Sequence, residues 1–121
     1  MDKNYHDKII DLFCNNISYF EKQFDFSIKN TFTKVYFHPY TEIDIIVEGM
    51  ADEQALIEVK SNGGLINKFT GDQFKNYRKY DSNASVYLLL GTKDKSLEIS
   101  DLKIIQFHPL NWVNAKIIAW V

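Results

Sequence analysis

The hydrophobic and polar positions between Thr41 and Lys60 alternate in two runs, which a short polar segment separates. In the first run every second residue is apolar, namely Ile43, Ile45 and Val47. In the second run, residues 55–60, the alternation resumes, and Glu58 stands two residues before Lys60. Because side chains two apart on a strand point to the same face, the pattern predicts two strands joined by a turn, with Glu58 and Lys60 side by side.

Periodicity predicts the other elements as well. Apolar residues recur at helical spacing from Tyr5 to Phe20, which predicts an amphipathic helix. Residues 25–37 alternate imperfectly, so we expect one strand, a turn near Lys29 and Asn30, and the beginning of the next strand. The later elements are a helix at 73–80, strands at 86–90 and 102–107, and a short apolar helix at 109–121. This order predicts a single α/β domain, residues 1–121, with a central mixed β-sheet flanked by helices.

Three ionisable residues, Asp44, Glu58 and Lys60, interrupt the apolar strands. Buried charges are costly unless they are paired or bind a metal. Two carboxylates on neighbouring strands can hold Mg²⁺, which can lower the pKa of a bound water. A lysine beside them can stabilise developing negative charge or position the water. The pattern therefore suggests metal-assisted hydrolysis of a phosphodiester; the alternative is an ordinary cross-strand charge pair on an exposed sheet face.

The spacing of these residues is similar to that of a known family. Asp44, followed after a turn by Glu58-Val59-Lys60, resembles the PD-(D/E)xK motif of the restriction-endonuclease-like nucleases. No proline precedes Asp44, because the strand reads Glu42-Ile43-Asp44. That form resembles the small archaeal and viral Holliday-junction resolvases.

The resemblance continues in the helix predicted at 73–80. Gln73 and Tyr77 lie one helical turn apart, on one face, and resemble an accessory motif on the helix that follows the ExK strand in several nuclease branches. The alternative is that Tyr77 packs in the core and Gln73 is exposed. With the two later strands, the matching segments extend over residues 25–110.

The resemblance implies a restriction-endonuclease-like core and a Mg²⁺-dependent DNA endonuclease, with Mn²⁺ as a substitute metal. The implied catalytic residues are Asp44, Glu58, Lys60 and Gln73. Asp44 and Glu58 would bind the metal, and Glu42 on the same strand face as Asp44 is a further candidate. A Glu of the first helix often joins this site in the family, but this helix has no Glu before Glu21. The candidates are Asp7 and Asp11, and Asp11 lies about as far ahead of the first strand as the family position does. The alternative is that both aspartates are helix-surface residues.

Basic residues gather after the Glu-Lys strand, although the net charge of the chain is −2. We expect this region to follow DNA phosphates; the alternative is a solvated helix face. The candidate DNA-binding residues are Lys68, Lys75, Arg78 and Lys79. Because junction resolution needs two symmetric cuts, the resemblance implies a homodimer acting on a four-way DNA junction. The apolar segment 109–121 would either complete the core or form a partner interface.

Length and composition narrow the class of protein. The chain has 121 residues, of which 45% are hydrophobic and 25% charged, as expected for a soluble globular domain. No apolar run approaches the ~20 residues that span a bilayer, so no membrane partner is expected. The single cysteine, Cys14, favours an intracellular setting, either the cytoplasm or that of a virus-infected host cell. Two other functions fit the pattern: a restriction, repair or end-processing nuclease with the same site, and a DNA-binding module without activity.

Overall fold

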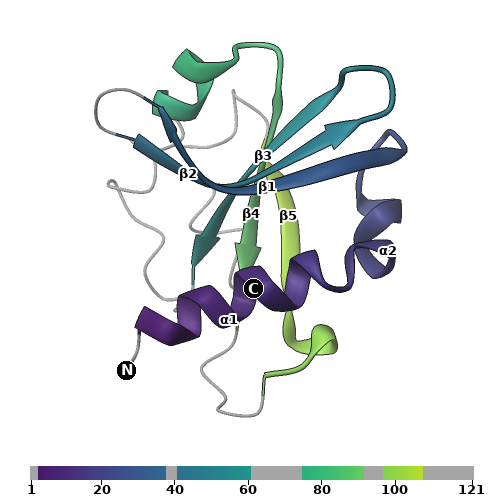
Figure 1. Cartoon of the computed structure of the whole chain (residues 1–121), viewed down its shortest axis with the longest axis vertical. Coiled ribbons are helices and arrows are strands. Elements are labelled where there is room, and N and C mark those ends of the chain that lie inside the picture. The colour runs from purple at the N-terminus through teal and green to yellow at the C-terminus, as the bar shows by residue number, and fades with distance from the viewer. Residues whose placement is uncertain (1–2, 38–40, 61–74, 92–96, 108–121) are drawn as a thin grey trace.

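A five-stranded mixed sheet lies at the centre of this α/β protein, together with a few short helices (Figure 1). The computed structural model describes residues 3–37, 41–60, 75–91 and 97–107. The strands lie side by side in sequence order: β1 (Ile28–Phe37), β2 (Thr41–Gly49), β3 (Gln54–Lys60), β4 (Ser85–Leu90) and β5 (Lys103–Phe107). The helices are α1 (Lys3–Cys14), α2 (Ile17–Phe20) and the 3-10 helices η1 (Glu21–Gln23) and η3 (Ile99–Asp101). Residues 75–80 are also helical.

Strands β3 and β4 are parallel, and the other neighbouring strands of the sheet are antiparallel. Antiparallel strands can be joined by a tight turn, as β2 and β3 are, whereas parallel strands need a crossover. Between β3 and β4 the chain includes the helical segment 75–80. The register then places Glu58 of β3 opposite Leu88 and Lys60 opposite Leu90. The crossover therefore returns the chain beside the strand that carries the Glu-Lys pair.

Alternate residues of β3 and β4 belong to two apolar clusters, one on each face of the sheet. Leu56 and Leu88 belong to the first cluster, in which Tyr77 of the helical segment packs. Ile57 and Leu89 belong to the second, to which α1 contributes Ile9, Ile10 and Phe13. The two helices therefore cover opposite faces, and Figure 1 shows α1 crossing the strands well apart from the segment at the upper left. Cover on both faces explains why β4 has no charged residue and is buried from Val86 to Leu90.

The helix predicted from Tyr5 to Phe20 divides into α1 and α2, with Asn15 and Asn16 between them. The Nδ2 of Asn16 donates a hydrogen bond to the carbonyl oxygen of Leu12 at 2.9 Å. Asparagine side chains compete with the backbone bonds of a helix in this way, which makes them poor helix-interior residues. The helical spacing of apolar residues continues after the break, and α2 still places Phe20 in the core.

The turn predicted near Lys29 and Asn30 is wrong, because β1 continues through both residues. Its register with β2 shifts there: Ile28 pairs with Gly49, but Asn30 pairs with Glu48. One extra residue in one strand forms a β-bulge, which bends the strand without ending it. The polar pair that predicted a turn marks this bulge instead.

The hairpin predicted from Thr41 to Lys60 is confirmed as β2 and β3, and the two later strands are confirmed as β4 and β5. The helix predicted at 73–80 is confirmed for residues 75–80. The helix predicted at 109–121 lies outside the described residues. Among the helices of the described ranges, none is long and apolar enough to cross a membrane.

Candidate active site

Asp44 lies where β2 separates from β3. The two strands are paired from their connecting turn up to Ile45 opposite Ile57. One residue further on, the Asp44 side chain continues the contact, because its Oδ2 accepts a hydrogen bond from the backbone N–H of Val59 at 2.8 Å. A carboxylate is thereby built into the opening between two inner strands of the sheet.

Strand β2 is irregular on its other side at the same residue. The N–H of Asp44 donates to the hydroxyl oxygen of Tyr77 at 3.3 Å, and the register with β1 passes over Asp44 and Lys34. Lys34 has a φ of 53°, in the left-handed region that non-glycine residues seldom adopt. Ile43 and Ile45 consequently belong to clusters on opposite faces, although residues two apart on a regular strand share one face. The local distortion of the hairpin is therefore centred on Asp44.

Glu58 lies beside this opening, and both of its carboxylate oxygens have a partner. The Tyr77 hydroxyl donates to Oε1 at 2.5 Å, and the Nζ of Lys60 is 3.3 Å from Oε2. Glu58 is only 3% exposed and Asp44 only 6%, so both acidic residues are buried. The predicted proximity of Glu58 and Lys60 is confirmed, and Tyr77 joins the two acidic residues through one hydroxyl group.

The surroundings of Glu58 disfavour its charged form. The pKa of Glu58 is raised to about 7, first by burial and then by the negative charge of Asp44. The hydrogen bond from Tyr77 and the charge of Lys60 act in the opposite direction without cancelling the effect. A bound cation would relieve this repulsion, since its charge offsets both carboxylates. Buried acidic groups with such shifted pKa values are typical of functional sites.

His6 of α1 reaches the same opening, and the sequence analysis did not identify it. Its Nε2 donates to the carbonyl oxygen of Val59 at 3.1 Å and lies 3.5 Å from Oδ2 of Asp44. The hydrogen bond with Asp44 raises the pKa of His6 above its usual value, and burial opposes that change. One signal was present: His6 precedes Ile9 and Ile10 at helical spacing, which places it on the buried face of α1.

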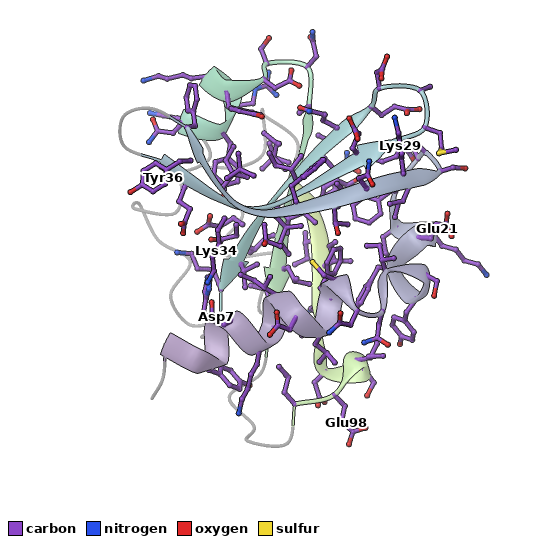
Figure 2. The ribbon with its side chains drawn as sticks, in the orientation of Figure 1. Asp7, Glu21, Lys29, Lys34, Tyr36 and Glu98 are labelled. Carbon is purple, nitrogen blue, oxygen red and sulfur yellow. The ribbon has the colours of Figure 1, made fainter. Side chains whose placement is uncertain are left out.

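The acidic residues of α1 point elsewhere. Asp11 is exposed, and it follows His6 by five residues, which is about 140° around a helix of 3.6 residues per turn. Asp7 forms an ion pair with Lys34 of β1, with 2.9 Å between Oδ1 and Nζ, and Figure 2 shows the two side chains facing each other. A role for Asp11 as a metal ligand stays a prediction.

The basic candidates are only partly described. Lys75 and Lys79 are exposed on the helical segment, Arg78 is half-buried, and Tyr77 between them faces the core. The two lysines are therefore on the side of the segment opposite to the Glu58 contact. Two further predicted site residues, Lys68 and Gln73, lie outside the described residues.

Comparison with known proteins gives no assignment. A scan against protein-family models, a search of the curated proteins and a search of the solved structures each find no match. The chemistry of the site residues is therefore the basis for a function.

The donor set of the opening fits Mg²⁺. Within the described ranges, no three His, Cys, Asp or Glu side chains are grouped so as to hold a metal ion by themselves. Mg²⁺ does not need such a cage, because it commonly binds one or two carboxylates and completes its shell with water and substrate phosphate. The buried oxygens of Asp44 and Glu58 supply that number of ligands, and burial and the charge of Asp44 together raise the pKa of Glu58 even though Lys60 lies beside it.

Proposed function

We propose that the protein is a divalent-metal-dependent endonuclease that hydrolyses DNA phosphodiester bonds. The observation that carries this proposal is the burial of Asp44 and Glu58 where β2 and β3 separate, with Lys60 in contact with Glu58. A surface charge pair would be exposed, and its pKa values would lie near their usual range. Two buried acidic residues beside a lysine are compatible with a metal-dependent phosphodiesterase site, because the acids can hold the metal that activates water.

The architecture supports the same proposal. A helix, three antiparallel strands, a helical segment and two further strands follow in the order expected of the restriction-endonuclease-like core. In this arrangement the candidate residues come from neighbouring inner strands, β2 and β3, rather than from loops. Sites on regular elements are held more precisely than sites on loops.

Each residue has a distinct task in the proposed chemistry. A bound Mg²⁺ would supply an activated water and polarise a phosphate oxygen. Asp44 and Glu58 would hold it, and Tyr77 keeps Glu58 oriented through its hydroxyl. Lys60 is placed to donate to the negative charge that develops on the phosphate, or to hold the attacking water. The exposed lysines of the helical segment would contact phosphates away from the cleaved bond, since they lie opposite to Tyr77.

Within this class, we propose a homodimeric Holliday-junction resolvase that acts on four-way junctions. The support is the Glu42-Ile43-Asp44 strand together with the order of the later motifs. Strand β1 lies beside β2, the strand that carries Asp44. Tyr36 of β1 is 75% exposed, so it is accessible to nucleic acid.

The test uses the purified protein with Mg²⁺ and three DNAs: a four-way junction, a linear duplex and a single strand. Asp44→Asn and Glu58→Gln each remove a ligand charge with little change in volume, so they should abolish cleavage while the fold and much of the DNA binding persist. Glu21→Gln, the same change at an exposed residue of η1, is the control and should cut normally.

Three results would separate the alternatives. Preference for the junction supports the resolvase, and equal cutting of linear DNA leaves a nuclease of another type. A wild-type protein that binds DNA and cuts none of the substrates with Mg²⁺ or Mn²⁺ would identify a binding module. A variant of Asp44 or Glu58 that cuts at the wild-type rate would remove that residue from the site.

A further inference from the structure

His6 of α1 contacts Val59 and Asp44 at the opening, and the proposed chemistry gives it no role. We propose that His6 is a positioning residue that holds the Asp44 carboxylate so that Oδ1, and not Oδ2, faces the bound metal. The inference rests on the proposed function, because it concerns how the same site is oriented.

The surroundings of the His6 ring decide between a ligand and a positioning role. Nε2 lies 3.1 Å from the carbonyl oxygen of Val59 and 3.5 Å from Oδ2 of Asp44. Both neighbours offer only lone pairs, so Nε2 must carry a hydrogen to contact them. A ring nitrogen that carries a hydrogen has no lone pair for a metal ion. Nε2 of His6 therefore acts on Asp44 rather than on the metal, and the other ring nitrogen, Nδ1, points away from that contact.

The effect on Asp44 is to occupy one of its two oxygens. Oδ2 already accepts the N–H of Val59 at 2.8 Å, and His6 approaches the same atom from α1. For Oδ1, the described part of the chain supplies no hydrogen-bond donor. Partners of this kind fix the direction of a ligating carboxylate. The geometry thus makes Oδ1 the oxygen that is available to a cation.

Two consecutive residues of α1 contact the two strands that flank β2. His6 bonds to Val59 in β3, and Asp7 pairs with Lys34 in β1 (Figure 2). Lys34 lies between Thr33 and Val35, which pair with the two chain neighbours of Asp44. Exposed ion pairs such as Asp7–Lys34 contribute little to stability, so the part-buried His6 contact is the one that can fix Asp44.

The experiment compares His6→Leu, which keeps apolar volume but loses the donor, with His6→Gln, whose amide can still donate. Lys8→Gln, at an exposed position of α1, is the control. Calorimetric titration gives the Mg²⁺ dissociation constant of each protein, and thermal unfolding without metal checks the fold. His6→Leu should weaken Mg²⁺ binding by about 10- to 100-fold, the usual effect of removing a partner of a metal ligand. His6→Gln should recover most of the Mg²⁺ affinity. If His6 were purely structural, the loss of Mg²⁺ affinity in each variant would instead parallel its loss of thermal stability.

A second measurement does not depend on catalysis or on the variants folding. ¹⁵N spectra of the labelled imidazole should show the hydrogen on Nε2 before and after Mg²⁺ is added. An Nε2 without a hydrogen, either before Mg²⁺ is added or as a result of adding it, would overturn the positioning role. So would a folded His6→Leu protein that binds Mg²⁺ as tightly as the wild type, and in that case the nuclease proposal stands. A wild-type protein that neither binds Mg²⁺ nor cuts DNA would overturn both.

Discussion

At the residue scale, Tyr77 shows how one side chain can serve two acidic neighbours. Its hydroxyl donates to Glu58 and accepts from the N–H of Asp44. Burial, followed by the negative charges of Glu58 and Asp44, raises the pKa of Tyr77 well above its usual value. The hydroxyl therefore keeps its proton at any ordinary pH and remains a donor to Glu58. Of the two interpretations of Tyr77, packing and contact with the site, both hold.

Lys60→Ala should slow cleavage by about 100-fold or more, the scale for removing a positioned electrostatic or acid-base group. The reason is that Lys60 lies 3.3 Å from Glu58 and would act on the charge that develops at the phosphate. Single-turnover rates at saturating Mg²⁺ measure the effect, with Lys103→Ala on β5 as an exposed control. A near-normal rate for Lys60→Ala would reduce the residue to a structural cation.

The raised pKa of Glu58 predicts that the metal-free protein loses stability as the pH rises. Below about pH 4.5 the group is protonated in both folded and unfolded chains, so it costs nothing. Between that pH and about 7 the unfolded chain loses the proton while the folded protein retains it, which lowers the free energy of unfolding. The raised pKa of His6 acts in the same direction at slightly higher pH.

The comparison with Glu58→Gln isolates this contribution. From pH 4.5 to 8 the variant should gain up to about 3 kcal/mol relative to the wild type, as follows from 1.36 kcal/mol per pKa unit. Urea unfolding in the presence of a chelator measures both proteins, and Glu21→Gln should parallel the wild type. A constant difference between wild type and Glu58→Gln would show that Glu58 ionises normally in the folded protein.

The sequence pointed to Asp44, Glu58 and Lys60 because charged residues stand out in short apolar strands, and Glu58 and Lys60 are two apart on a regular strand. Helical spacing puts His6 on the buried face of α1, but it does not reveal the partner of His6, because Val59 is 53 positions away in the chain. The left-handed conformation of Lys34 was equally invisible, since no glycine or asparagine marks it. Contacts between distant segments thus separate the predicted part of the site from the missed part.

At the element scale, the strands were predicted best. The errors occurred at polar residues that are compatible with either a turn or a continuing helix or strand. The Asn15-Asn16 pair ends a helix although the apolar spacing continues into α2. Lys29 and Asn30 predicted a turn but lie in a bulge of β1. In both places, packing of the flanking apolar residues, rather than local preference, determines whether the chain reverses or continues.

The packing of α1 against the end of β4 gives a further prediction. Gly91 is buried, and a Cβ built there would lie 2.8 Å from Cγ1 of Ile9 and closer still to its Cδ1. Gly91→Ala should therefore destabilise the fold by about 1–3 kcal/mol, the usual cost of overpacking a core. Denaturant unfolding measures the loss.

A double-mutant cycle provides the control. Ile9→Val removes Cδ1, so the Gly91→Ala change should cost less in the Ile9→Val protein than in the wild type. If Gly91→Ala lowers the free energy of unfolding equally in both backgrounds, the Cβ at position 91 does not clash with Ile9.

At the scale of the whole molecule, the site is enclosed from both faces of the sheet. α1 brings His6 from one face, and the helical segment brings Tyr77 from the other. One copy presents one such site, so paired incision of a junction requires two copies. The predicted dimer would use the apolar segment around Trp112 and Trp120, which lies outside the described residues.

Sedimentation should give the mass of a dimer, and a junction labelled on each strand should show symmetric nicks. Two copies double the lysines that contact phosphate, so junction binding should fall steeply with added salt despite the net charge of −2 per chain. A monomer that degrades linear DNA as readily as junctions would contradict the resolvase and leave the general nuclease.

The long-range contacts at Asp44 also have a consequence for when activity arises. His6 and Val59 are 53 residues apart, and Asp44 and Tyr77 are 33 apart, whereas the β2–β3 hairpin closes over a few residues. Contacts over long loops carry a larger entropic cost and tend to form late in folding. The hairpin with its acidic residues can thus exist before either helix has docked. A partly folded chain would lack an oriented Asp44, so under the proposed function it could not cleave nucleic acid until folding is complete.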